Sequence, residues 1–193
     1  MNTKTDDHGR NNAIAGMDNI IEMVTALECD YDRLEELKED LENLEYEREQ
    51  CTWNSADEGR EARIDEQTAY KTACEELDKW NLDNRDKYKE LLEAAGECAS
   101  REDAEQRIQE DALCVEVRSG WTSLGEALEA EEYMILLTTG GPALRIRGEL
   151  RDNEPHRCWL EYQDWGTPWT EYNGENNDVD ALLTYSQQFY FGE

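Results

Sequence analysis

The sequence predicts an α+β protein in which an N-terminal antiparallel, coiled-coil-like helical hairpin precedes a small α+β domain with a short antiparallel sheet. Apolar residues of the first half recur at spacings of three and four, which is typical of coiled-coil helices. Apolar and polar residues of the second half alternate in short runs bounded by turn residues, which is typical of strands. We therefore expect a disordered tail over residues 1–14, an acidic helical hairpin region over 15–112 and the α+β domain over 113–193.

The first helix is expected to run unbroken from about Ala15 to Gln50. A turn over residues 52–59 follows, with Ser55 as N-cap and Glu58 completing a capping box, and a second helical stretch then extends to about Cys98. Two such stretches joined by a short turn favour antiparallel pairing, although a parallel homodimer of the first helix is an alternative. The seam of the first helix comprises Met17, Ile20, Val24, Leu27, Tyr31, Leu34, Leu37, Leu41 and Leu44.

The elements after residue 98 are predicted from caps, alternation and turn residues. Ser100 and Asp103 form a capping-box pattern that opens a helix, and Asp178 is the expected N-cap of the last helix. The expected elements are a helix over 101–112, a strand over 113–117, a helix over 124–137, strands over 144–150 and 158–162 with a turn at 152–155, and a helix from 178 to about 188.

Charge is the strongest compositional signal. The 193 residues include 48 acidic and 19 basic residues, a net charge of −29. Such a chain repels nucleic acid and anionic membrane, so we expect cationic protein surfaces as partners and neither nucleic acid nor membrane as direct ones. No apolar run has the roughly 18 residues of a membrane span, and residues 1–12 lack a secretory signal, so a cytoplasmic location is expected.

The residue types that carry chemistry are sparse and scattered. The six cysteines show no paired spacing and are expected to be reduced, and neither His8 nor His156 has a partner at zinc-ligand spacing. His156 and Cys158 lie two apart without an orienting third group, and N-capping explains Asp178 better than calcium binding does. We therefore expect no catalytic residues, no metal site, no cofactor and no enzymatic activity.

The region from Glu28 to Glu49 is the most acidic part of the chain. Eleven acidic and three basic residues give it a net charge of −8 over 22 residues, or about 33 Å of helix. One DNA strand carries about ten charges over that length, so such a helix could imitate phosphates, with support from a second acidic helix alongside. An ordinary solvated coiled-coil face is the alternative. The candidate partner-binding carboxylates are Asp32, Glu35, Glu36, Glu39, Asp40, Glu42 and Glu45.

An aromatic loop is the second candidate for binding. Trp165 and Trp169 flank Gly166 and Pro168, and further aromatic residues lie close by in the sequence. Tryptophan residues often supply binding hot spots. In a domain this small they also commonly form the core, which is the alternative interpretation of the loop.

Several strings of the second half resemble small proteins carried by bacteriophages and plasmids. The resemblance covers about residues 113–193 and implies an origin on a mobile element, but no activity or functional residue comes with it. It rests on Arg118-Ser119-Gly120-Trp121, Thr139-Gly140-Gly141-Pro142-Ala143, Arg145-Ile146-Arg147-Gly148-Glu149, the run from Trp159 to Thr170, and Phe189-Tyr190-Phe191-Gly192-Glu193.

Together, these observations predict an inhibitor of a basic, nucleic-acid-binding host defence complex of the CRISPR-Cas or restriction type. It would act in the host cytoplasm by stoichiometric binding, as an acidic DNA mimic. The alternatives are a non-enzymatic coiled-coil scaffold, or a regulator that binds a basic host protein, with the acidity serving solubility only.

Overall fold

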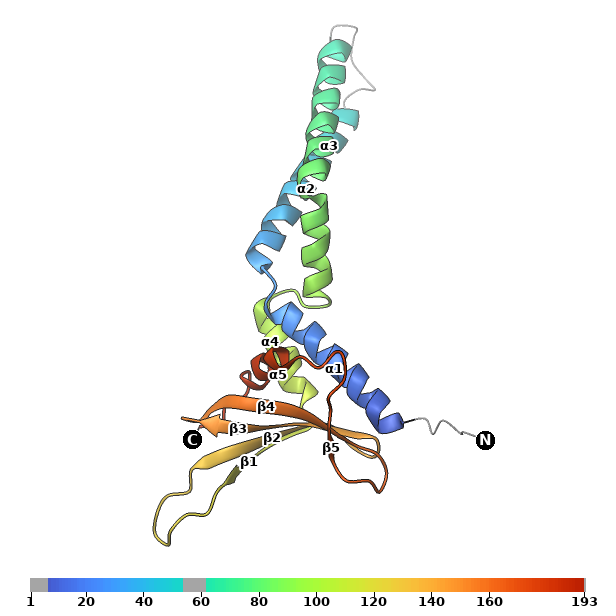
Figure 1. The fold of residues 1–193 in the computed structure, drawn as a ribbon. Coiled ribbons are helices and arrows are strands. Elements are labelled where there is room, and N and C mark those ends of the chain that lie inside the picture. The colour runs from blue at the N-terminus through green and yellow to red at the C-terminus, as the bar shows by residue number, and fades with distance from the viewer. Residues whose placement is uncertain (1–6, 54–61, 193) are drawn as a thin grey trace, which may run out of the picture. The chain divides into compact units, whose positions relative to one another are not determined.

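The computed structural model describes residues 7–53 and 62–192 and divides the chain into two compact units (Figure 1). Cys29–Glu97 form one, which we call the hairpin unit; the chain up to Glu28 and from Cys98 onwards forms the other, the sheet unit. The predicted α+β class, with a helical hairpin and an antiparallel sheet, is confirmed. The boundaries of these units differ from the predicted ranges 15–112 and 113–193. The helices at both ends of the first range, before Cys29 and after Glu97, belong to the sheet unit.

The hairpin unit consists of α2 (Tyr31–Trp53) and α3 (Ala62–Ala95), which lie side by side (Figure 1). The start of α2 meets the end of α3, since the Cys29 thiol lies 3.5 Å from the carbonyl oxygen of Leu91, so the helices are antiparallel. The predicted Ser55–Glu58 capping box lies outside the described residues. The small core between the helices comprises Leu37, Trp80 and Leu91, with Cys29, Leu34, Leu41, Leu44 and Tyr88 packed against it.

The predicted single helix from Ala15 to Gln50 is wrong, because the chain leaves the helical path between Glu28 and Asp30. Helix α1 (His8–Leu27) ends there, and the Asp30 carboxylate accepts a hydrogen bond from the backbone N–H of Arg33 at 3.0 Å, as the N-cap of α2. The predicted tail over 1–14 is also wrong from residue 8 onwards, where α1 is already formed and Ala13 is fully buried. Residues 1–6 lie outside the described part.

The sheet unit contains a five-stranded antiparallel sheet whose strands lie in sequence order (Figure 1). A tight turn with positive φ at Asp152 and Asn153 joins the third and fourth strands, as the turn chemistry predicted. The strands are β1 (Cys114–Ser119), β2 (Ala130–Thr138), β3 (Ala143–Arg151), β4 (Glu154–Gln163) and β5 (Thr170–Glu171).

Helices α1, α4 (Arg101–Asp111) and α5 (Val179–Ser186) lie on one face of this sheet (Figure 1). The predicted N-caps are confirmed, because Ser100 caps α4 and Asp178 caps α5. Residues of alternate strand positions face these helices and are buried with them. This core includes Met17, Ile20, Met23, Leu27, Ile108, Tyr133, Ile135, Leu144, Ile146, Leu160, Leu182 and Tyr185.

The predicted helix over 124–137 is wrong. The structure has a loop up to residue 129 and then strand β2, in which Tyr133, Ile135 and Leu137 are buried at every second position. The apolar residues of this segment are compatible with either period over a short stretch, and pairing with strands on both sides decides in favour of β2.

Candidate functional site

Helix α2 presents an acidic face on the side away from α3. Leu34, Leu37 and Leu41 pack towards α3, so at 100° per residue five exposed carboxylates lie on the opposite arc of the helix, and the exposed Asp40 lies at the margin of that arc. We call these six the acidic face: Asp32, Glu35, Glu36, Glu39, Asp40 and Glu42. Glu45, also a predicted site residue, is exposed but lies on the flank of the helix, nearer the seam with α3.

Two carboxylates of the acidic face have a cation beside them within the helix. The Arg33 guanidinium lies 2.5 Å from Glu36, and the Lys38 ammonium lies 4.0 Å from Glu42. Among the residues that the structure describes, the other four members form no ion pair: Asp32, Glu35, Glu39 and Asp40. The acidic face therefore carries a net charge of about −4 that the helix itself does not neutralise.

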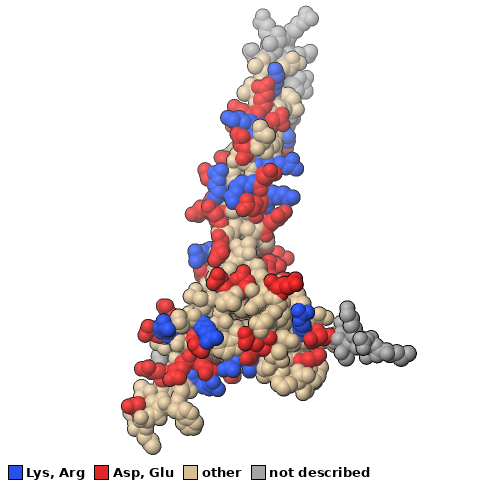
Figure 2. Space-filling model, viewed as in Figure 1, with Lys and Arg blue, Asp and Glu red and all other residues tan. Residues whose placement is uncertain are grey.

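Helix α3 contributes less negative charge than expected of a second acidic helix that supports the first. It contains nine acidic and six basic residues, a net charge of −3, whereas α2 contains nine acidic and three basic residues, a net charge of −6. Lysine and glutamate alternate along α3 in ion pairs one turn apart: Lys71–Glu75, Lys87–Glu90 and Lys89–Glu93. Figure 2 shows the two charge signs interleaved on the hairpin unit. The density that resembles a DNA strand is thus concentrated on α2.

The two predicted tryptophans lie in the sheet unit, in the segment between β4 and β5. The Trp165 side chain is largely exposed and lies over Gly141, where an added Cβ would meet its ring at 2.5 Å. The Trp169 ring is half-buried beneath the Arg145 guanidinium, whose central carbon lies 4.0 Å from the ring centroid. Nearby, Tyr172 is buried in the core. The aromatic residues are therefore divided between core and surface.

The sheet face opposite the helices carries a network of arginines and glutamates that sequence reasoning missed. Arg145 pairs with Glu161 at 2.6 Å, and Glu132 accepts from both Arg118 and Arg147 at 2.5 and 2.6 Å. The hydrogen bond from Arg118, and then that from Arg147, hold the pKa of Glu132 below its usual range. The only signal in the sequence was the alternation of arginines with buried residues along β3.

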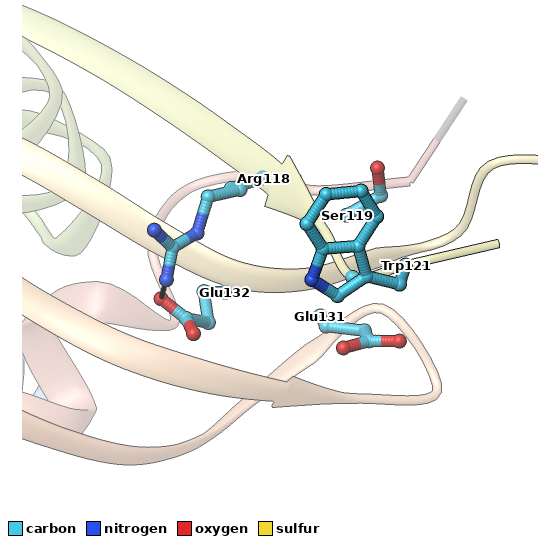
Figure 3. Close-up of a pocket in the computed structure, with 6 residues that line it drawn as sticks. Arg118, Ser119, Trp121, Glu131 and Glu132 are labelled. Atoms are coloured by element: carbon cyan, nitrogen blue, oxygen red, sulfur yellow. Dashed lines mark hydrogen bonds and ion pairs between the residues drawn. The ribbon is translucent and has the colours of Figure 1, made fainter.

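A hollow of about 520 Å³ lies where β1 leads into the loop before β2 (Figure 3). Arg118 and Glu132 form one side through their ion pair, and Trp121 and Glu131 form the other. Trp121 projects into solvent and is fully exposed. Ser119 and Gly120 complete its lining, which combines charged, aromatic and small residues.

The catalytic alternative at His156 and Cys158 is not assembled. Cys158 is buried under α5, 3.8 Å from the carbonyl oxygen of Val179, and burial raises the pKa of its thiol to about 11. His156 is exposed at an irregularity in the pairing of β3 and β4. A thiol that stays protonated at neutral pH, without a base beside it, is a poor nucleophile.

Within the described residues, no cluster of three or more His, Cys, Asp or Glu side chains is arranged to hold a metal ion. None of the described helices has the length and apolar character to cross a membrane. The six cysteines are unpaired thiols. Comparison of the chain with protein-family models, curated proteins and solved structures gives no match.

Proposed function

We propose that this protein is a non-enzymatic inhibitor that occupies the DNA-binding groove of a basic, nucleic-acid-binding protein. The acidic face of α2 takes the place of phosphates, and binding is stoichiometric. The resemblance of residues 113–193 to phage- and plasmid-carried proteins favours a host defence enzyme as the target, of the CRISPR-Cas or restriction type.

The observation that carries this proposal is the charge of the acidic face of α2, in which four carboxylates form no ion pair with any other described residue: Asp32, Glu35, Glu39 and Asp40. From residue 32 to residue 42 the helix rises about 15 Å, and one DNA strand carries about four phosphates over that length. The net charge of the acidic face, about −4, matches this number. Its carboxylates are held on a helix whose opposite side is packed, so their spacing is fixed before binding.

The balance of charge distinguishes α2 from α3, since α2 has a net charge of −6 and α3 a net charge of −3. On α3, ion pairs along the helix hold most lysines beside glutamates, as expected of an ordinary solvated face. On α2, Glu35 and Glu39 stand four residues apart as like charges, which costs a few tenths of a kcal/mol. Asp86 and Glu90 have the same spacing on α3, but there Lys87 pairs with Glu90. On α2 a cationic partner would offset the cost.

The test compares two variants with the same net charge. One replaces the four carboxylates of α2 by amides (Asp32→Asn, Glu35→Gln, Glu39→Gln and Asp40→Asn); the control replaces four on α3 (Glu75→Gln, Asp83→Asn, Glu90→Gln and Glu93→Gln). Each change removes four negative charges and keeps side-chain shape. The measurement is inhibition of DNA binding and cleavage by a panel of purified Cas effector complexes and restriction endonucleases.

We expect the α2 variant to lose inhibition of any enzyme that the native protein inhibits, and the α3 control to keep it. At about 0.5 kcal/mol for each charged contact, four lost contacts weaken binding by about 2 kcal/mol, roughly thirtyfold. Equal loss in both variants would mean that only total charge matters. Unchanged inhibition in both would exclude α2 and favour the alternative of a scaffold whose acidity serves solubility.

A further inference from the structure

Strand β1 carries apolar side chains that the core of the sheet unit leaves uncovered. Val115 pairs with Ile135 and Val117 pairs with Tyr133, so the two valines point to the face of the sheet that the helices cover. Ile135 and Tyr133 are buried, yet Val115 is 39% and Val117 is 54% exposed. Neither valine belongs to the hydrophobic core, which ends at β2.

The edge of β1 is open as well. It is the first strand in the sheet order, so one side of its backbone has no neighbouring strand among those described. Edge strands usually carry lysine, proline or a bulge that discourages pairing, and β1 contains no lysine or proline. The irregularity in its pairing with β2 falls between Arg118 and Ser119, where Glu131 is the additional residue on β2. An extended chain therefore fits along this edge.

We propose that a second copy of this chain docks here, with β1 pairing antiparallel to β1 of the other copy across a twofold axis at Val117. A twofold axis makes the contact isologous, so each pair of opposed residues occurs twice. Opposed residue numbers then sum to 234. Val117 faces Val117, Val115 faces Ser119, and the exposed Trp121 faces Leu113, which is 58% exposed.

Charge complementarity selects this register. With the axis at Val117, Glu116 of each copy lies opposite Arg118 of the other, which gives two attractive pairs on the other face of the sheet. An axis at Glu116 would place two glutamates opposite each other. An axis at Val115 would place Glu116 opposite Cys114 and leave Arg118 without a carboxylate across the interface. A register in which opposed residue numbers sum to 233 or 235 would turn the valines of one copy to the other face of the joint sheet.

The proposal is independent of the acidic face of α2, and its response to salt has the opposite sign. Two copies with a net charge of −29 each repel one another, and added salt screens this repulsion. The contact itself is uncharged on one face, and on the other face its opposite charges balance. Dimerisation should therefore strengthen as salt rises from about 0.05 to about 0.5 M, whereas binding through the acidic face should weaken.

Disulfide trapping tests the register directly. At the axis, the two copies of residue 117 have their Cα atoms about 4.5–5.5 Å apart, within the range that a disulfide bridges. Val117→Cys should therefore form a 117–117 disulfide on mild oxidation, identified by mass spectrometry of linked peptides. Val115→Cys is the matched control, since the two copies of residue 115 would lie about 13 Å apart along the strands. A linked pair at 115 and none at 117 would overturn the register.

Sedimentation analysis of the full chain tests the dimer itself. The native protein should show a concentration-dependent species of twice 22.4 kDa. Val117→Lys places two like charges opposite each other at the axis, so this variant should sediment as a monomer. Because Val117 is exposed, the variant should keep the circular dichroism spectrum of the native chain. A native chain that stays monomeric at raised salt, or a Val117→Lys variant that still dimerises, would overturn the proposal. A monomeric native chain would favour the alternative, in which an extended segment of another protein pairs with the edge of β1.

Discussion

Asp30 lies at the boundary between α1 and α2, which the spacing of apolar residues predicts as one continuous helix. Helix α1 ends at Leu27, and Asp30 accepts the hydrogen bond from the N–H of Arg33 as the N-cap of α2, which begins at Tyr31. N-capping aspartates are worth about 1 kcal/mol. The capping pattern was present in the sequence, but the continuing three-four spacing of apolar residues concealed it, since a helix on a sheet and a helix in a hairpin bury stripes of the same period.

We predict that Asp30→Ala lowers the free energy of unfolding by about 1 kcal/mol, because it leaves an N–H at the start of α2 without its acceptor. Urea denaturation followed by circular dichroism measures the change. Glu39→Ala is the control, as this side chain is exposed and lies within the helix; it should change stability by less than about 0.5 kcal/mol. Equal effects would argue against the cap.

The buried thiol of Cys158 gives the sheet unit a dependence on alkaline pH. Burial raises its pKa to about 11 from an ordinary value of 9.0, so between these values the unfolded chain loses a proton that the folded chain keeps. Stability is then fully present below about pH 9 and falls as pH rises towards 11. This sign follows from the protonated thiol being the form that the core accommodates.

Comparison of the native protein with Cys158→Ala at pH 7.5 and 9.5 measures this contribution. The native protein should lose about 0.8 kcal/mol more than the variant between the two pH values. Buried tyrosines, whose pKa values are raised by the same burial, remain in both proteins and cancel in the comparison. An equal loss in both proteins would show that Cys158 titrates as it does in the unfolded chain.

At the scale of secondary structure, the sequence predicts elements best where local chemistry decides. The caps at Ser100 and Asp178 and the turn at Asp152 and Asn153 were predicted correctly because each depends on hydrogen bonds or backbone angles within a few residues. Strand β2 was predicted as a helix because its alternation is visible only over Tyr133, Ile135 and Leu137, and its pairing partners are distant in the sequence.

The candidate sites follow the same division. The acidic face of α2 was predictable because helical geometry alone places Asp32, Glu35 and Glu39 together. The arginine–glutamate network was not, since Arg118, Arg147 and Glu132 come from three strands whose register a single sequence does not specify. Likewise, the exposure of the valines of β1 depends on how far the helices extend over the sheet, and no local sequence pattern predicts that.

The two units have separate hydrophobic cores with no residue in common. We predict that Leu37→Ala, which empties the fully buried centre of the hairpin core, lowers the stability of the hairpin unit by about 2–4 kcal/mol. Hydrogen exchange followed by mass spectrometry should show lost protection in peptides from α2 and α3 while peptides from β3 and β4 keep theirs.

Leu92→Ala on α3 is the control for this change, because its side chain is 46% exposed and truncation leaves no cavity. It should alter protection little. If Leu37→Ala reduced protection equally in both units, the two cores would unfold as one cooperative body.

For the molecule as a whole, the sign and position of the charged residues are the main basis of the proposed function. The net charge of −29 is unevenly distributed: α2 has nine acidic and three basic residues, α3 has nine acidic and six basic residues, and arginine–glutamate pairs lie on the sheet. Solubility requires net charge but no particular arrangement. The excess of negative charge on the acidic face of α2 is therefore the feature that the proposed inhibition explains.

The most direct test of this claim is a DNA-competition titration with a charge-reversed α2. Asp32, Glu35, Glu39 and Glu42 are replaced by lysine, which leaves the leucines of the seam unchanged and hardly alters helix propensity. The native protein should displace DNA from an inhibited Cas effector or restriction enzyme, less effectively as salt shortens the Debye length below about 8 Å, and the folded variant should not displace it. A folded variant that displaces DNA as well as the native protein would contradict mimicry by α2.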